Sequence, residues 1–130
     1  MKIRYLGGEY ILFAHSNIID KIGGLHGVRD INLFLSLIEK PKGRFGGKEL
    51  YKGIFTKAAV YLEGFARYHV FIDGNKRTAF VIALRFLYIN GYELDIPQAE
   101  VENFVLDTAV GRNNLKIVSA WLKKYARKIK

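Results

Sequence analysis

The chain has no cysteine, and only two of its 130 residues are proline. The lack of cysteine excludes disulfides and thiolate-bound metals. The longest apolar run, Thr78 to Ile89, is interrupted by Arg85 and is too short to cross a bilayer. The segment MKIRYLGGEY also lacks the apolar region of a signal peptide. We therefore expect a cytoplasmic protein with no membrane contact.

Acidic residues are scarce relative to basic ones: the chain has 12 Asp and Glu but 21 Lys and Arg, which gives a net charge of +9. A surface of this charge favours an anionic partner, such as a nucleotide, an acidic protein or nucleic acid. The segment KKYARKIK at 123–130 concentrates five of these cations. Its simplest interpretation is a solvated helix end, where cations complement the helix dipole.

Hydrophobic residues make up 50% of the sequence, which is enough for a proper core, and we expect a single domain over residues 1–130. Helical spacing of apolar residues predicts six helices. They cover about 9–22, 30–40, 54–66, 75–90, 97–109 and 118–125. A weak alternation favours a short strand at 1–6, and three glycines at 41–51 predict an exposed loop or small hairpin. The predicted fold is an all-α compact bundle.

The fourth predicted helix is apolar on nearly every side from Ala79 to Ile89. Such a helix is typical of a position surrounded by other helices. We therefore expect it to be the central, buried helix of the bundle, with Gly91 just past its end.

A polar motif, HVFIDGNKRTAF at 69–80, directly precedes this predicted central helix. The first turn of a helix leaves backbone N–H groups unpaired, and with the helix dipole they attract anions. Gly74 would allow close approach of a ligand. Asn75, Lys76 and Arg77 add donors and charge in the same turn, so phosphate is the expected ligand.

Two further residues of the motif suit group transfer from a nucleotide. A carboxylate beside phosphates is the usual way to hold Mg²⁺, which makes Asp73 the candidate metal ligand. An imidazole titrates near neutral pH, so His69 is the candidate general base. Phe71 is expected to anchor the loop in the core.

Each motif residue also has a purely structural interpretation. Asp73 could be a helix N-cap, His69 a structural histidine, and Lys76 with Arg77 a solvated first turn. Cations at a helix N-terminus oppose the dipole, however, which itself favours a bound anion. His15 and His26 have no partner at metal-ligand spacing, and we expect both to be structural.

The motif resembles the signature of the Fic/Doc superfamily, in the form H-x-F-x-D-[A/G]-N-K-R-T-A of its death-on-curing (Doc) branch, at every defined position. The stretches GGLHGVRD at 23–30, FGGKELY at 45–51 and FLYINGY at 86–92 resemble the same branch. The resemblance implies a compact helical fold in which Phe45, Gly46, Gly47 and Lys48 form a hairpin flap that aligns a target polypeptide by strand pairing.

The resemblance also implies an activity, which is transfer of part of a nucleotide to a protein hydroxyl. Fic proteins transfer AMP, whereas Doc-type toxins transfer the γ-phosphate of ATP to a threonine of translation elongation factor Tu. Lys76 and Phe80 replace a glycine and an arginine of the Fic pattern. Both replacements fit a nucleotide held in the opposite direction, so a kinase is favoured and AMP transfer is the alternative.

Within that resemblance, His69 would be the base and Asp73 would hold Mg²⁺, while Gly74, Asn75, Lys76 and Arg77 would bind the phosphates of ATP. Val81 stands where some members of the branch have a polar residue, so one ligand contact is missing.

Regulation is expected to come from a second protein, because the chain lacks the inhibitory pattern [S/T]-x-x-x-E-[G/N] of many Fic proteins. A small, acidic, partly disordered antitoxin would suit the basic surface. A different class of function, a catalytically silent basic module that binds protein or nucleic acid, stays open. For the enzyme we expect no direct contact with nucleic acid.

Overall fold

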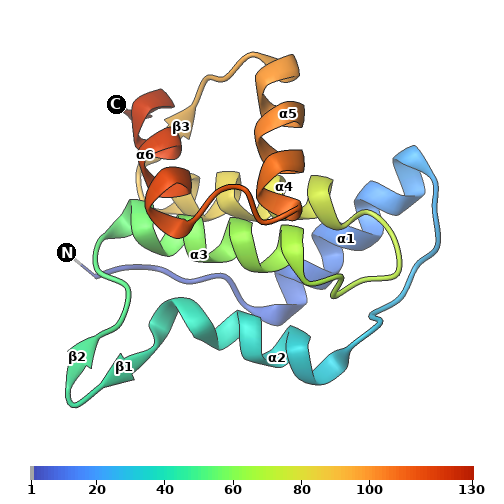
Figure 1. Cartoon of the computed structure of the whole chain (residues 1–130), viewed down its shortest axis with the longest axis horizontal. Coiled ribbons are helices and arrows are strands. Elements are labelled where there is room, and N and C mark those ends of the chain that lie inside the picture. Colours follow the sequence, from blue (N-terminus) through green and yellow to red (C-terminus); the bar gives the residue numbers. More distant parts are fainter. Residues whose placement is uncertain (1) are drawn as a thin grey trace.

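The computed structural model describes residues 2–130, and in these residues six α-helices and two small sheets form the fold (Figure 1). The helices are α1 (Gly8–Ile22), α2 (Ile31–Glu39), α3 (Ile54–Arg67), α4 (Asn75–Ile89), α5 (Gln98–Ala109) and α6 (Leu115–Tyr125), with a short 3₁₀ turn η1 (Lys40–Lys42). The strands are β1 (Arg44–Phe45), β2 (Lys48–Glu49), β3 (Tyr92–Leu94) and β4 (Ala126–Lys128). The prediction of an all-α bundle with six helices and a small hairpin is confirmed.

The helix at the centre of the bundle is α3, not the motif helix α4. Every residue from Lys57 to Ala66 is buried, and α3 lies between α2 on one side and α5 and α6 on the other (Figure 1). Small residues allow this crowding, since a Cβ on Gly64 would come within 2.8 Å of a methyl of Leu37. By contrast, α4 leaves Arg85 and Tyr88 exposed. The prediction that 75–90 is the central helix is therefore wrong, although α4 buries one full face.

The core is built mainly where α3 and α4 pack together. The rings of Tyr61 and Phe86 are 4.9 Å apart, and both side chains are fully buried. Phe71, from the loop between the two helices, packs against Phe34 and Phe65 with ring centroids 5.9 and 6.2 Å away. The expectation that Phe71 anchors the loop in the core is confirmed.

Local signals in the sequence fix several element boundaries. The carboxylate of Asp30 accepts a hydrogen bond from the Leu33 N–H at 3.0 Å and caps α2. α2 ends at Glu39, and Pro41 lies in the 3₁₀ turn that follows. Gly46 and Gly47 have φ of 59° and 80°, which suits the tight turn between β1 and β2.

The two ends of the described chain differ from the predictions. Residues 2–6 form no strand, because the backbone of Arg4 bonds to the buried side chain of Asn90 instead of to another strand. The Arg4 N–H donates to Asn90 Oδ1 at 2.9 Å, and Asn90 Nδ2 donates to the Arg4 carbonyl at 2.8 Å. Met1 lies outside the described residues. At the other end, α6 stops at Tyr125, and residues 126–128 pair with β3 as an antiparallel strand instead of continuing the helix.

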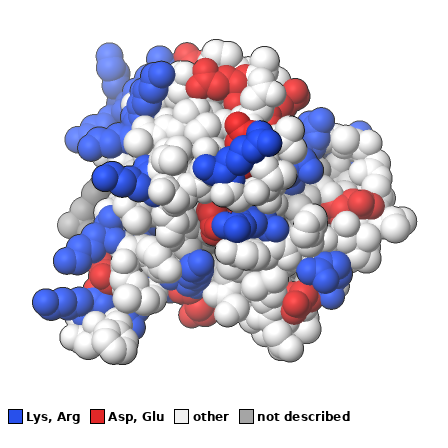
Figure 2. Space-filling view, viewed as in Figure 1, with Lys and Arg blue, Asp and Glu red and all other residues white. Residues whose placement is uncertain are grey.

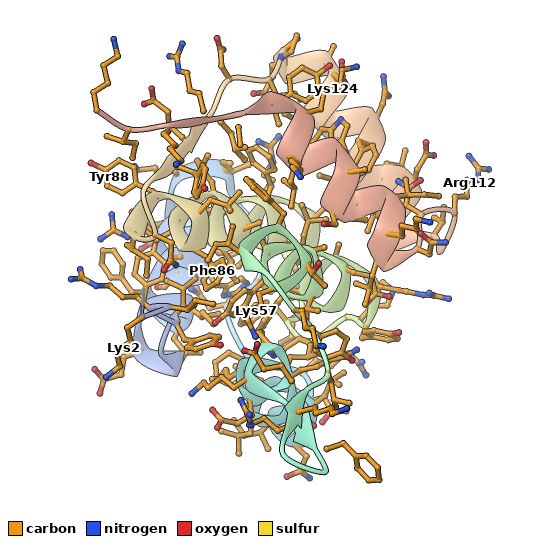
Figure 3. All side chains as sticks on the ribbon, turned by 90° about the vertical axis from the view of Figure 1, so that its left-hand side faces the viewer. Lys2, Lys57, Phe86, Tyr88, Arg112 and Lys124 are labelled. Carbon is orange, nitrogen blue, oxygen red and sulfur yellow. The ribbon has the colours of Figure 1, made fainter. Side chains whose placement is uncertain are left out.

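Basic side chains gather along the left-hand edge of the molecule in Figure 2, where both termini and the β1–β2 hairpin lie in Figure 1. Figure 3 shows Lys2, Arg112 and Lys124 extending from the periphery, whereas Lys57 lies among the packed side chains near Phe86. Within residues 2–130, no helix has both the length and the apolar character needed to cross a membrane.

Candidate active site

The polar motif forms the loop at the C-terminal end of α3 and the first turn of α4. The segment Gly23–Asp30 lies against this loop in antiparallel fashion. Val28 and Phe71 form an isolated bridge, the Arg29 N–H donates to the Val70 carbonyl at 2.7 Å, and the Ile72 N–H donates to the Gly27 carbonyl at 3.1 Å. The GGLHGVRD stretch is therefore the structural partner of the motif.

His69 is exposed and has a left-handed backbone, with φ of 51°. Among residues 2–130 it is the one non-glycine residue with positive φ. Such a conformation is unfavourable for most side chains, and it persists here because the Arg29 guanidinium donates to the carbonyls of His69 and Tyr68, at 2.6 and 3.2 Å. The surrounding structure thus fixes the backbone while the imidazole faces solvent.

Asp73 is held at two of its atoms. Its Oδ2 accepts a hydrogen bond from the Leu25 N–H at 2.7 Å, and its backbone carbonyl lies 2.7 Å from Nε2 of His15. The residue does not act as the N-cap of α4, because Gly74 occupies that position and no side chain caps the helix. The N-cap interpretation of Asp73 is therefore wrong, and its Oδ1 has no hydrogen-bond partner within residues 2–130.

His15 on α1 supports this loop from the core side, by contacts with Asp73 and Phe71. Its sequence position alone did not reveal this role. Its ring is 3% exposed and stacks on Phe71 with centroids 3.8 Å apart and planes 7° from parallel. The sequence signal was a polar residue on the apolar face of α1, beside Ile11 and Ile19. The expectation that His15 is structural is confirmed. His26 instead lies at the surface and bonds to Asp20 at 2.8 Å.

Gly74 is required by the fold, and its predicted contact with a ligand stays a prediction. Its φ is 77°, and an added Cβ would come within 2.9 Å of Ile19 on α1. The neighbouring Asn75 side chain closes the loop, since its Oδ1 accepts from the Phe71 N–H at 2.9 Å and its Nδ2 donates to the Phe71 carbonyl at 3.0 Å. The Asn75 side chain thus has a structural role in the loop, and its predicted contact with phosphate stays a prediction. Its backbone N–H still belongs to the first turn of α4.

Lys76 and Arg77 follow in that first turn, and both side chains are exposed. Neither forms an ion pair with any residue of 2–130. Two unpaired cations beside uncapped helix N–H groups form a site that suits an anion.

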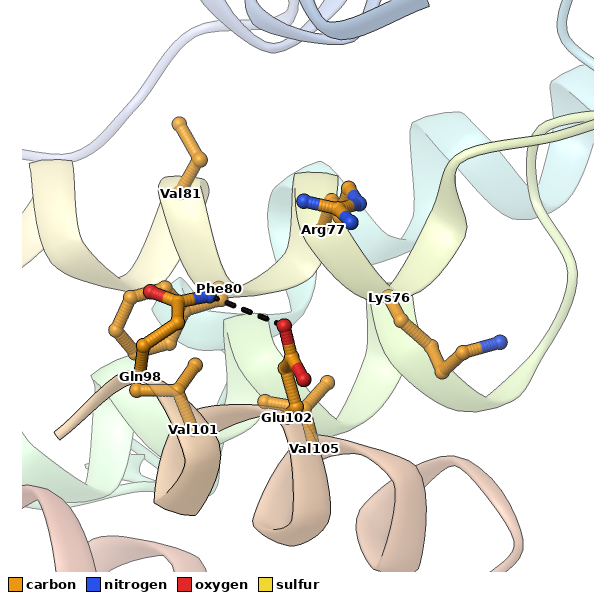
Figure 4. Close-up of a pocket in the computed structure, with 8 residues that line it drawn as sticks. All are labelled: Lys76, Arg77, Phe80, Val81, Gln98, Val101, Glu102 and Val105. Carbon is orange, nitrogen blue, oxygen red and sulfur yellow. Dashed lines mark hydrogen bonds between the residues drawn. The ribbon is translucent and has the colours of Figure 1, made fainter. Parts of the chain in front are cut away.

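A cleft of about 330 Å³ opens between α4 and α5 next to these cations (Figure 4). Its lining residues are Lys76, Arg77, Phe80, Val81, Gln98, Val101, Glu102 and Val105. In Figure 4, Gln98 and Glu102 reach from α5 toward α4, and their side chains are joined by a hydrogen bond of 3.4 Å. The sequence did not reveal this cleft, because two helices that are not consecutive in the chain form it.

The hairpin expected to act as a flap lies at the opposite end of α3. It precedes the first turn of α3, whereas His69 follows the last turn, and 14 helical residues separate these points by about 20 Å (Figure 1). Phe45, Gly46, Gly47 and Lys48 are all exposed, and their hairpin lies at the end of α3 opposite the motif loop (Figure 1). The structure therefore does not bring the predicted flap to the motif; the segment Gly23–Asp30 occupies that place.

No group of three or more His, Cys, Asp or Glu side chains suited to a metal occurs within residues 2–130. Any cation at this site would depend on Asp73 together with oxygens from a ligand and from water. Mg²⁺ is usually bound in this way, by one or two carboxylates and substrate phosphates. The donor set thus fits Mg²⁺ with a nucleotide rather than a metal held by protein alone.

Comparison with known proteins gives the family of this chain. Residues 5–87 match the Fic/DOC family. Two curated relatives extend the likeness to nearly the whole chain. Toxin Doc of Mycolicibacterium smegmatis is 35% identical over 94% of this chain and 93% of its own length. Protein kinase doc of Escherichia phage P1 is 32% identical over 94% of this chain and 95% of its own length.

The protein therefore belongs to the Fic/DOC family, and its relatives place it in the Doc branch.

Proposed function

We propose that this protein is a Doc-type toxin that transfers the γ-phosphate of ATP to a serine or threonine hydroxyl of a protein, with a translation factor such as elongation factor Tu as the target. One observation carries this proposal: an exposed, conformationally fixed His69 stands beside a partly free Asp73 carboxylate and an uncapped helix N-terminus with two unpaired cations. The phage relative is named a protein kinase, which supports phosphoryl transfer.

The reaction needs little covalent chemistry from the protein. The imidazole of His69 would accept the proton of the target hydroxyl as its oxygen bonds to the γ-phosphorus. The bond from that phosphorus to the β–γ bridging oxygen breaks, and ADP leaves with the electron pair. The N–H groups of the first turn of α4, with Lys76 and Arg77, would stabilise charge on the phosphate oxygens.

Asp73 is the residue that would hold Mg²⁺, with Oδ1 available and Oδ2 fixed by the Leu25 N–H. When bound with ATP, the ion would neutralise charge on the phosphates. The His15 contact with the Asp73 carbonyl would keep this carboxylate in place.

The protein target would meet the surface around the motif. Leu25 and Ile72, which flank the site, are 64% and 47% exposed. An extended polypeptide carrying the reactive hydroxyl could contact both side chains while presenting that hydroxyl to His69. This assignment gives the segment Gly23–Asp30 the docking role first expected of the hairpin.

An antitoxin is part of the proposal, since both relatives belong to the Doc branch and the surface carries a net charge of +9. An acidic, partly disordered segment that folds on binding would complement this surface. The proposed site of action is the cytoplasm.

Labelled ATP tests the reaction. The protein should move label from γ-labelled ATP to a translation factor, and α-labelled ATP should leave proteins unlabelled. Label from α-labelled ATP would instead establish AMP transfer. His69→Ala should reduce γ-transfer by about 10²-fold or more. His69→Asn is the matched variant, because asparagine tolerates the left-handed backbone and separates loss of the base from loss of the loop conformation.

The high positive charge also supports the binding-module alternative. That function predicts salt-sensitive association with DNA or RNA that is unchanged by His69→Asn. Absence of any labelled protein, together with such binding, would replace the kinase proposal.

A further inference from the structure

His69 lies at the end of α3, in a position where helices favour glycine. The helix ends at Arg67 with Tyr68 as its C-cap, so His69 is the first residue beyond it. Helices often have a left-handed residue at this point, and it is usually glycine because a Cβ disfavours that conformation. His69 adopts it nonetheless, with φ of 51°. Its backbone therefore needs support from outside the helix.

Arg29, which lies 40 residues earlier in the chain, supplies this support. Its Nε donates to the His69 carbonyl at 2.6 Å, and its Nη2 donates to the Tyr68 carbonyl at 3.2 Å. The planar guanidinium thus bridges two consecutive carbonyls, at a helix C-terminus where the dipole favours a cation. Within residues 2–130 Arg29 forms no ion pair that would compete for these donors.

The segment Gly23–Asp30, which carries Arg29, is itself anchored along the motif loop. The Arg29 N–H donates to the carbonyl of buried Val70 at 2.7 Å, and the Leu25 N–H donates to Oδ2 of Asp73 at 2.7 Å. The guanidinium is therefore attached to a backbone that is fixed relative to the loop. One short segment thus contacts the backbone of the candidate base and the carboxylate of the candidate metal ligand.

We propose that Arg29 is a positioning residue for phosphoryl transfer. It holds the His69 backbone in the left-handed conformation, which sets the direction from which the exposed imidazole meets the hydroxyl of the protein target. Without the guanidinium, a non-glycine backbone favours negative φ by roughly 5- to 30-fold, so the imidazole would point elsewhere in most molecules. The part of His69 as the base rests on the proposed function, whereas the conformational link between Arg29 and His69 does not.

Transfer from γ-labelled ATP to a saturating protein substrate tests this role. Arg29→Ala should lower kcat roughly 5- to 30-fold and change the KM for ATP by less than about twofold, because only the base is displaced. Arg29→Lys should recover part of the loss, since an ammonium donates to one carbonyl but lacks the fork that bridges two. Arg67→Ala is the matched control and should leave kcat unchanged, because this exposed arginine pairs with Glu63.

A double variant with His69→Asn separates positioning from direct contact. The base is already absent in His69→Asn, so adding Arg29→Ala should reduce the remaining transfer by less than about twofold. A further loss of roughly 5- to 30-fold in the double variant would show that Arg29 acts on the phosphates or on the target itself. That result would overturn the positioning role.

The backbone conformation of His69 can be measured without any turnover. In NMR spectra of the full chain, a strong nuclear Overhauser effect between the amide proton and Hα of residue 69 marks positive φ. This signal should be present in the wild type and in Arg67→Ala and should weaken in Arg29→Ala. An unchanged signal in Arg29→Ala would overturn the inference, whatever happens to kcat. If the signal weakens but the wild type labels no protein, Arg29 still sets the conformation of His69 and only the proposed kinase activity is wrong.

Discussion

The two loops at the ends of α3 both carry exposed residues, yet they are held in different ways. The motif loop at 68–74 is fixed by hydrogen bonds from Arg29, His15, Leu25 and Asn75, and Phe71 anchors it in the core. The hairpin at 44–49 projects from the other end of α3, and Phe45 at its tip is 79% exposed. The two loops therefore differ less in their surface position than in the number of hydrogen bonds that hold their backbones.

The hairpin has one strong attachment to the core, through Lys57. The Nζ of this fully buried lysine donates to the Pro41 carbonyl at 3.0 Å and pairs with Glu49 on β2 at 3.1 Å. The same Nζ lies 5.5 Å from the centre of the Tyr5 ring. A buried charge is costly unless it is paired and hydrogen-bonded, and here the hairpin supplies its partner.

The largest effect on stability is expected at the motif loop. Asn75→Ala leaves the N–H and the carbonyl of buried Phe71 without the side-chain partner seen here, at a cost of about 3 kcal/mol. Chemical denaturation measures this cost. Asn103→Ala, at an exposed position of α5, is the control and should change the free energy of unfolding by less than about 0.5 kcal/mol. Equal effects of the two variants would show that Asn75 does not hold the loop closed.

High pH should lower the free energy of unfolding of the whole domain, because Tyr61 is buried in the core beneath both loops' common helix, α3. Burial raises the pKa of Tyr61 to about 12 from its usual 10. The unfolded chain therefore ionises this tyrosine first, so the stability present below pH 10 falls by about 2–3 kcal/mol as the pH rises to 12. Denaturation curves at pH 9 to 12 measure this loss.

Tyr61→Phe is the comparison for that series. It cannot ionise at residue 61, so its stability should fall less steeply over the same interval, with the other tyrosines as a common background. Parallel curves for wild type and variant would contradict the role of Tyr61.

A smaller and local effect is expected at the hairpin. Lys57→Met removes the charge from the core and leaves the Pro41 carbonyl without this donor, which costs about 1–2 kcal/mol. Hydrogen exchange of residues 43–50 should become faster, whereas the motif loop should keep its protection. Lys48→Met, at an exposed lysine of the same hairpin, should change neither. Faster exchange in the motif loop would show that the two regions are coupled.

The variants with the smallest expected effect on stability test which of the two candidate surfaces docks the protein substrate. Phe45→Ser and Leu25→Ser alter exposed side chains, so each should change stability by less than about 0.5 kcal/mol. Only Leu25→Ser should raise the KM for the protein substrate, since only Leu25 lies beside the motif. Neither should alter the affinity for ATP. A raised KM for Phe45→Ser would restore the flap role first expected of the hairpin.

Local patterns in the sequence were sufficient for much of the fold. The spacing of apolar residues predicted all six helices, and the three glycines at 41–51 predicted a loop or small hairpin where β1 and β2 are found. That His69, Asp73 and the first turn of α4 form one local site was also readable, because these residues are close together in the chain.

The sequence could not assign roles that depend on partners distant in the chain. The structural bonds of the Asn75 amide to Phe71 were not predicted from the sequence. His15 appeared unrelated to the motif, yet it bonds to the Asp73 carbonyl from 58 residues away. The strand at 126–128 pairs with β3 only because α4 and α6 bring both segments together.

The sequence by itself determined the helices and the reactive motif, because helical periodicity and capping act over a few residues. Only the tertiary structure decided which helix is central, which loop lies beside His69, and that a cleft adjoins Lys76 and Arg77. These features arise from packing between elements remote in the chain. Close approach at small residues such as Gly64, rather than the number of apolar residues in a helix, sets the arrangement.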